Sequence, residues 1–174
     1  VNRARTPWVI VTAHYPMYQT YDPSHPANVA SDTKDADGGA RARLRQNSTS
    51  VLSAALAIAD LEPMLKEFRV DIYMAGHNHN YETTWPMYNN TVQQKSYHLP
   101  QAPVHVVSGA AGPPETDYFL PTNKTPSWSR ISSRFLAPSY SRVTVFDHRT
   151  LQYEQIANDN GTVIDSFTIT RSAE

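Results

Sequence analysis

The chain has 174 residues, which is about the length of one domain and enough to bury a core of ordinary size. Hydrophobic residues make up 40% of it and charged residues 18%, a composition typical of folded chains and not of disordered ones. The net charge of −1 argues against binding of nucleic acid through overall charge, and zero Cys excludes a disulfide scaffold, a thiolate zinc site and a cysteine nucleophile.

The first half of the chain predicts a strand, a long loop and helices. Trp8 to Val11 is a short apolar run that ends in Thr12-Ala13-His14, which indicates a buried strand leading into a polar loop. Residues 18–49 are polar and contain several Pro and Gly residues, as expected of a long surface loop. Residues 50–68 are rich in helix formers, and Pro63 should lie in the first turn of a new helix, since an interior proline costs about 3 kcal/mol.

The second half predicts further strands. Val70 to Ala75 is a second strand that leads into Gly76-His77-Asn78-His79, so strand, helix and strand form a βαβ unit. Val104 to Val107 follows as another strand. Residues 141–146, 151–156 and 163–170 read as an antiparallel meander, with a hairpin turn at Asn158 to Gly161. The predicted fold class is α/β with an antiparallel C-terminal portion.

The apolar runs are far shorter than the roughly 20 residues of a membrane span.

Three histidines follow the two predicted parallel strands. His77 and His79 are two positions apart, so both imidazoles can reach one side of an extended loop. His14 follows the other strand, and the carboxyl ends of parallel strands meet at the same edge of a sheet. Neutral imidazole is a ligand for Zn, Fe and Mn, so this pattern predicts a metal centre. Three histidines alone would also suit a mononuclear zinc hydrolase, although no acidic base accompanies them.

Other candidate residues have plainer interpretations. His105 lies in an apolar strand and is expected to be a hydrogen-bonded core residue, whereas His98 and His148 lie near turns and are expected to be solvated. We call the loop that carries His77 and His79 the histidine loop. Tyr81 and Glu82 either support this loop or simply pack beneath it, and the sequence favours neither alternative.

Several motifs resemble the C-terminal half of a purple acid phosphatase, within the metallophosphoesterase superfamily. They are Val-Thr-Ala-His followed by Tyr-Pro-Met-Tyr, Gly76-His77-Asn78-His79-Asn80-Tyr81-Glu82, the Val-Ser-Gly-Ala-Ala-Gly string from Val107 to Gly112, and the segments from Tyr140 to Val145 and Asp165 to Phe167. The resemblance implies a metallophosphoesterase β-sandwich flanked by helices. Residues 1–174 would then be the C-terminal portion of the catalytic domain, with the loop at about 18–49 and antiparallel strands at about 139–171.

The resemblance also implies a reaction and its metals. It implies hydrolysis of phosphate esters at a dinuclear centre of Fe and a second divalent metal (Zn, Mn or Fe). By their place in the motifs, His14 and His77 are implied ligands of the divalent metal and His79 of the iron. His25 lies one residue beyond the position of the family's substrate-facing histidines and, if it faces the site, is the implied proton donor to the leaving alcohol.

The chain departs from the family pattern in two ways. It lacks the upstream Asp-x-Gly, Gly-Asp-x-x-Tyr and Gly-Asn-His-Asp/Glu motifs that carry the remaining ligands, and Thr83 stands where many relatives have Arg. Since the sequence opens at Val1 without an initiator Met or signal peptide, we expect an N-terminal polypeptide of the same precursor as a partner. The alternative is a decayed phosphatase-like module with a binding or structural role.

Four Asn-x-Ser/Thr sequons, at Asn47, Asn89, Asn123 and Asn160, predict a glycoprotein of the secretory pathway, either secreted or lysosomal/vacuolar.

Overall fold

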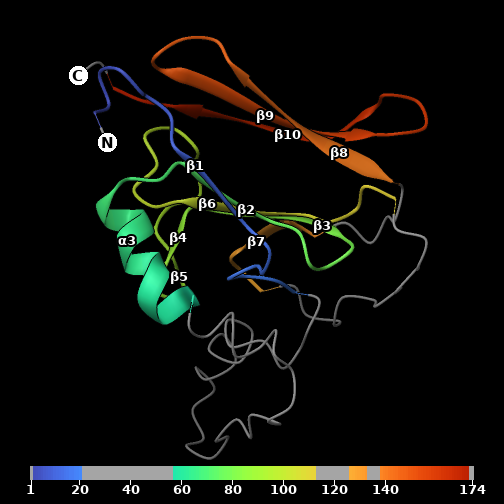
Figure 1. Cartoon of the computed structure of the whole chain (residues 1–174), viewed down its shortest axis with the longest axis horizontal. Coiled ribbons are helices and arrows are strands. Elements are labelled where there is room, and N and C mark those ends of the chain that lie inside the picture. The colour runs from blue at the N-terminus through green and yellow to red at the C-terminus, as the bar shows by residue number, and fades with distance from the viewer. Residues whose placement is uncertain (1, 21–56, 113–125, 133–137, 173–174) are drawn as a thin grey trace, which may run out of the picture.

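The structure is a computed structural model that describes residues 2–20, 57–112, 126–132 and 138–172 (Figure 1). Strands dominate the described residues, which contain one short α-helix. The described part has no helix with the length and apolarity needed to cross a bilayer.

The larger sheet has five strands in the order β1-β2-β6-β3-β7. Strands β1 (Ile10–Ala13), β2 (Ile72–Ala75) and β6 (Val104–Ser108) run parallel, which confirms the predicted βαβ arrangement. Strand β3 (Tyr81–Thr84) then pairs antiparallel with β6, and β7 (Ser129–Ser132) pairs antiparallel with β3. The sheet is therefore mixed, with its parallel half at the β1 end.

The smaller sheet is the predicted C-terminal meander. It consists of β8 (Ser139–Val145), β9 (Thr150–Ala157) and β10 (Val163–Thr170), paired antiparallel in the order β10-β9-β8. The predicted hairpin turn joins β9 to β10, where Gly161 has a φ of +71°, a conformation that glycine adopts without steric cost. The antiparallel ending predicted from the sequence is thus confirmed.

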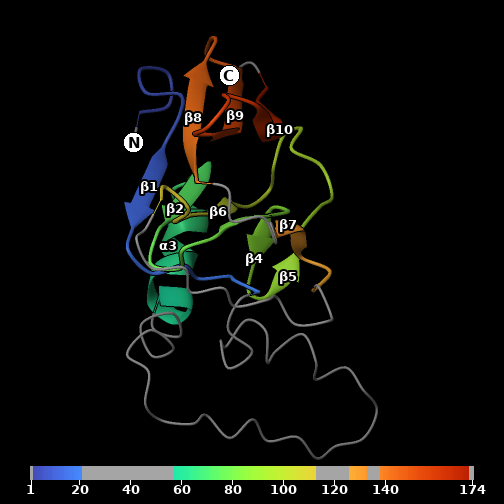
Figure 2. The same cartoon turned by 90° about the vertical axis from the view of Figure 1, so that its right-hand side faces the viewer.

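The two sheets stack face to face and enclose an apolar core (Figure 2). Strands β6, β9 and β10 contribute alternate residues to this layer, as the two-residue period of a strand requires. The larger sheet supplies Ile72, Tyr81, Val104 and Val106, and the smaller sheet supplies Leu151, Tyr153, Phe167 and Ile169.

A second core lies on the other face of the larger sheet. There the π-helical turn η1 (Ala57–Leu61) continues into α3 (Glu62–Glu67), and Pro63 occupies the first turn of α3 as predicted. A small hairpin of β4 (Met87–Tyr88) and β5 (Thr91–Val92) lies beside the helix. The buried apolar residues of this core include Met17, Tyr18, Leu65, Tyr73, Met87 and Trp128.

Two expectations about the first strand were wrong, and two strands were missed. The first strand begins two residues later than the apolar run at Trp8, and it is largely exposed because it pairs only with β2 among the described residues. Strands β3 and β7 were not predicted, because their polar residues do not form an apolar run. All four residues of β3 are nevertheless buried.

His105 is in the core, as expected, but the expected hydrogen bond of its ring is not found among the described residues. Its side chain lies between the rings of Tyr18 and Tyr73, at centroid distances of 4.7 and 5.5 Å. Neither ring nitrogen has a hydrogen-bond partner among the described residues. Burial lowers the pKa of His105 to about 3, so the imidazole is neutral at ordinary pH.

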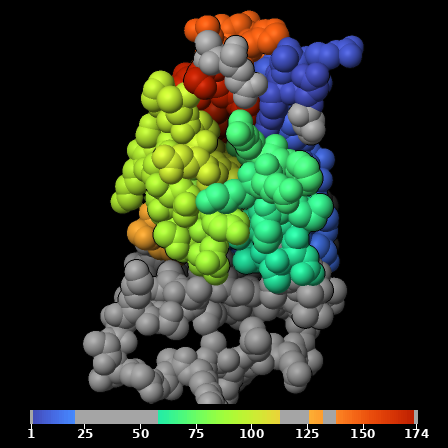
Figure 3. Space-filling model, turned by 90° about the vertical axis from the view of Figure 1, so that its left-hand side faces the viewer, coloured from blue at the N-terminus to red at the C-terminus, as the bar shows by residue number. Residues whose placement is uncertain are grey.

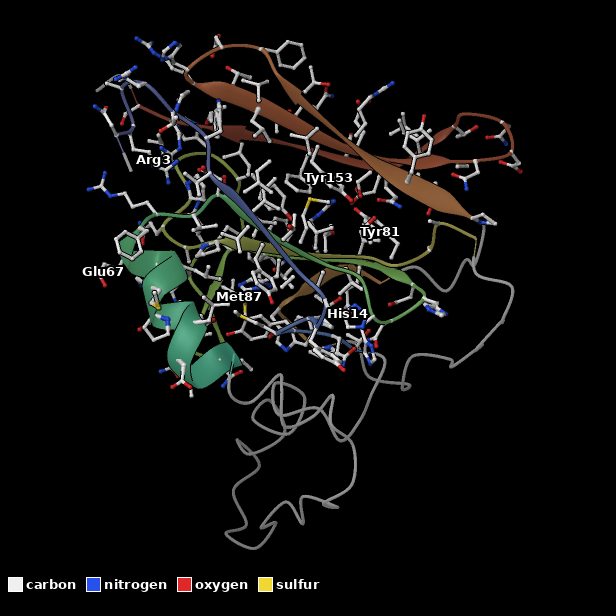
Figure 4. All side chains as sticks on the ribbon, in the orientation of Figure 1. Arg3, His14, Glu67, Tyr81, Met87 and Tyr153 are labelled. Atoms are coloured by element: carbon white, nitrogen blue, oxygen red, sulfur yellow. The ribbon has the colours of Figure 1, made fainter. Side chains whose placement is uncertain are left out.

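A buried ion pair also joins the two sheets. The carboxylate of Asp165 on β10 accepts hydrogen bonds from the guanidinium of Arg130 on β7 and, at 2.6 Å, from the hydroxyl of Tyr81 on β3. Tyr81 is therefore directed into the layer between the sheets (Figure 4).

Candidate metal centre

The register of the parallel strands places two of the candidate histidines together. Ala13 pairs with Ala75, so β1 and β2 end at the same edge of the sheet. His14 follows β1 directly and His77 follows β2 after Gly76, whose amide donates to the carbonyl of His14 at 3.2 Å. The two loops therefore start side by side.

The two imidazoles are in direct contact. His77 Nδ1 lies 3.0 Å from His14 Nε2, and the ring centroids are 4.9 Å apart in an edge-to-face arrangement. The ring of Tyr15 covers both, at 4.8 Å from His14 and 4.4 Å from His77. His77 adopts a φ of +35°, a left-handed conformation that is uncommon outside glycine and that bends the loop sharply after β2.

The surroundings of His77 favour its neutral form. Burial is the main reason that its pKa lies below the ordinary value, and the neighbouring His14 and His79 lower it further. A neutral imidazole is the form that binds a metal ion. Two nitrogens each about 2.0–2.1 Å from one tetrahedral zinc ion lie roughly 3.3 Å apart, so the 3.0 Å separation is close to that of two ligands of one ion.

The third candidate ligand, His79, lies on the same loop as His77 and is exposed. Within the described ranges, no three His, Asp or Glu side chains form a group arranged to hold a metal ion. His25 lies outside the described residues.

The histidine loop is packed tightly against the segment that follows β6. The amide of Gly109 donates to the carbonyl of Asn80 at 3.0 Å. A Cβ on Gly109 would lie 1.8 Å from the carbonyl oxygen of Asn78, so only glycine fits there. Asn78 and Asn80 are both buried, and one polar side-chain atom of each has no hydrogen-bond partner in the described part of the chain. These residues belong to the motifs quoted from the sequence, but no role was predicted for them, although a glycine directly after a strand is a signal of close backbone approach.

Glu82 holds the loop that follows His14. Its carboxylate is 1% exposed and accepts hydrogen bonds from the amide of Thr20 at 2.8 Å and from the hydroxyl of Ser129 at 2.7 Å. Burial raises the pKa of Glu82 to about 7. Nearer to His14, the hydroxyl of Tyr73 donates to the carbonyl of Tyr15 at 2.8 Å. Of the two residues considered as supports, Glu82 thus fastens the loop and Tyr81 instead bonds Asp165.

Comparison with known proteins gives a consistent result. Residues 102–166 match the family described as iron/zinc purple acid phosphatase-like protein C. Acid phosphatase type 7 of Danio rerio is 32% identical over 98% of this chain and 36% of its own length. A purple acid phosphatase from yellow lupin (Lupinus luteus) seeds has the same fold over 98% of this chain, with a TM-score of 0.68 and 30% identity.

The chain is similar to the purple acid phosphatases. It resembles their C-terminal part, as the motifs predicted, and the mixed α/β fold agrees with that of the lupin enzyme. The chain spans about a third of the length of the Danio rerio protein and 26% of the lupin chain.

Not every similar purple acid phosphatase carries a name that indicates activity. The Arabidopsis thaliana protein named "Probable inactive purple acid phosphatase 27" is 30% identical over 98% of this chain and 24% of its own length. The similarity to these proteins therefore supports the fold, and the names of the relatives do not all indicate an active phosphatase.

Proposed function

We propose that the protein containing this chain hydrolyses phosphate esters at a dinuclear metal centre, and that His14, His77 and His79 are the ligands that this chain supplies. The observation that carries the proposal is the 3.0 Å separation of the His14 and His77 ring nitrogens. It supports the assignment of both histidines to one divalent ion (Zn, Mn or Fe), with His79 on the iron. The two metals would supply an activated water and would bind the phosphoryl oxygens.

The chain's own residues orient the ligands. The amide of Gly76 and the hydroxyl of Tyr73 hold the backbone around His14, while Glu82 holds the end of the same loop at Thr20. The ring of Tyr15 lies against both imidazoles. His25, which lies outside the described residues, is proposed as the proton donor to the leaving alcohol.

The proposal includes a partner for this chain. Three neutral imidazoles cannot offset the charge of about +5 on an iron(III) and divalent metal pair, so the site requires carboxylate and phenolate ligands. We propose that an N-terminal polypeptide of the same precursor supplies them, and that residues 1–174 form the C-terminal portion of that catalytic domain.

We also propose that the protein belongs to the secretory pathway. Of the four sequons, those at Asn89 and Asn160 fall on exposed residues, whereas Asn47 and Asn123 lie outside the described residues. N-linked glycans on at least one of them would support a secreted, lysosomal or vacuolar protein. Loss of mass on glycosidase treatment of the native protein is the expected result.

Metal analysis of single variants tests the ligand assignment. In the intact protein, His14→Ala or His77→Ala should remove the divalent metal, and His79→Ala should preferentially remove iron. His148→Ala, which replaces an exposed histidine near the β8–β9 turn, serves as the control. Unchanged iron in the His79 variant would contradict its assignment.

A second candidate function is a binding or structural module whose site has decayed. It is favoured by Thr83 at a position where many relatives have Arg, and by the similarity to the Arabidopsis thaliana protein whose name includes "inactive". Hydrolysis of a generic aryl phosphate by the metal-loaded intact protein separates the two. A protein that holds both metals but does not hydrolyse the ester would support the second function.

A further inference from the structure

A cavity of about 570 Å³ lies at the end of the sheet opposite the histidines. Its walls include Val70 and Asp71 before β2, Pro103 before β6, and the segment that precedes β1. The cavity is thus at the amino ends of the parallel strands, whereas His14 and His77 follow their carboxyl ends. Figure 4 shows the same separation between Arg3 and His14.

The cavity concentrates positive charge. Five Lys and Arg side chains line it, and Asp71 is the only acidic residue among the described residues of its wall. The chain as a whole has a net charge of −1, so this excess is local. The cations come from four separate parts of the chain: Arg3, Lys66 and Arg69, Arg149, and Arg171. Figure 3 shows the N-terminal segment, α3 and the residues near 100 meeting on this face.

Asp71 holds two of these guanidinium groups in place. Its carboxylate, which is 1% exposed, lies 3.0 Å from Arg3 and 2.7 Å from Arg171. Arg171 also lies over the ring of Trp8, with its Cζ 5.3 Å from the ring centroid. One carboxylate cannot neutralise two guanidinium groups, so this buried arrangement retains a net positive charge.

Arg69 and Arg149 add two further guanidinium groups around the fixed pair. The backbone carbonyl of Arg69 accepts hydrogen bonds from both Arg3 and Arg171. These bonds fix the position of the Arg69 backbone beside the cavity. The carbonyl of Arg149 accepts a hydrogen bond from the amide of Arg171 at 2.9 Å. The side chains of Arg69 and Arg149 are both exposed and line the cavity.

We propose that this cavity binds a small multivalent anion of the phosphate class, such as inorganic phosphate or pyrophosphate, at a site separate from the metal centre. Planar guanidinium groups donate paired hydrogen bonds to phosphate oxygens, and the exposed side chains of Arg69 and Arg149 would supply these donors. Arg3 and Arg171 already donate to Asp71 and to backbone carbonyls, so they add positive charge at fixed positions. The excess of cations favours a multivalent anion over chloride.

Titration of the intact protein with pyrophosphate tests the proposal. The titration is done with a metal chelator present and at constant ionic strength, so that binding at the metal centre and general screening do not contribute. We expect saturable binding by the unmodified protein. The double variant Arg69→Gln/Arg149→Gln should raise the Kd at least about tenfold, because it removes two charge-assisted donors.

Two controls locate the binding. Arg142→Gln removes an exposed arginine of β8 that does not line the cavity and should leave the Kd unchanged. His77→Ala should also leave it unchanged, because the histidines are at the other end of the sheet. Equal affinity of the double variant and the unmodified protein, or loss of binding in His77→Ala alone, would overturn the proposal.

A single replacement tests the proposal even if the double variant does not fold. Arg149→Gln changes only an exposed side chain, and it should raise the Kd about threefold while the Tm without anion stays unchanged. The same titration with inorganic phosphate should give weaker binding with the same ranking of variants, since phosphate carries less charge. No binding of either anion by the unmodified protein would also refute the site.

Discussion

The carbonyl oxygen of Asn78 occupies the space that a Cβ atom at position 109 would need, at a distance of 1.8 Å. This contact fixes how closely the segment after β6 approaches the loop that carries His77 and His79. Real Cβ atoms do not come so close to a backbone oxygen, so one of the two segments must move if the glycine is replaced.

Gly109→Ala should therefore displace the histidine loop and lower the free energy of unfolding by about 1–3 kcal/mol, as overpacking does elsewhere. Gly76→Ala is the matched control, because nothing lies within 4 Å of a Cβ built there. Chemical denaturation of the two variants checks the difference. Equal stability of both would contradict the close approach.

Glu82 should make the chain less stable as pH rises. Burial raises its pKa from 4.5 to about 7, so the folded chain holds this proton more tightly than the unfolded chain. The free energy of unfolding should fall between pH 4.5 and 7, by up to about 3 kcal/mol from this group. Glu82→Gln should remove this part of the pH dependence. Glu67→Gln, on the exposed surface of α3, should retain it.

His105 should act in the opposite direction. Its pKa is lowered from 6.5 to about 3, so the unfolded chain binds the proton more tightly and stability is lost as pH falls below about 6.5. At pH 5 the loss from this group is about 2 kcal/mol.

His105→Phe keeps an aromatic ring between Tyr18 and Tyr73 and removes two ring nitrogens that have no partners in the described residues. We expect it to raise stability, and to do so more at pH 5 than at pH 8. Thermal unfolding at both pH values measures this. His148→Gln, at an exposed position, is the control, and a gain that is independent of pH would argue against a buried neutral imidazole.

Asp165 should contribute strongly to the contact between the two sheets. Asp165→Ala leaves the guanidinium of Arg130 without its carboxylate and the hydroxyl of Tyr81 without its acceptor. We expect a loss of about 3 kcal/mol in the free energy of unfolding. Asp159→Ala, in the exposed turn between β9 and β10, should cost far less. Similar losses in both variants would show that the ion pair contributes little.

Apolar runs predicted the elements that they form. The predicted runs 70–75, 104–107 and 163–170 correspond to β2, β6 and β10, although β2 begins only at Ile72, and each strand places apolar side chains in a core. Strand β3 could not be found in this way. Its residues Glu82 and Thr83 are polar and buried, and their partners Thr20, Ser129 and Asp165 lie far away in the sequence.

The sequence predicted part of the candidate site, as it predicted part of the fold. Parallel pairing of two strands was enough to predict that His14 and His77 lie together, because both follow strand ends at one edge. The hydrogen bonding of His105 was not predictable, since it depends on which side chains of other elements surround the ring. The need for glycine at 109 was missed for the same reason, because the group that requires it belongs to the loop after β2.

The sheet topology has a consequence for the order of folding. The meander pairs neighbours in sequence, as where Val145 faces Leu151, and such hairpins form quickly. Ile10 instead pairs with Ile72, so β1 joins the sheet only after the chain between them has closed a loop of 62 positions. Closing a loop of this length costs entropy before any contact forms, which slows folding. The pairing that brings His14 to His77 is therefore expected to form late, after the C-terminal sheet.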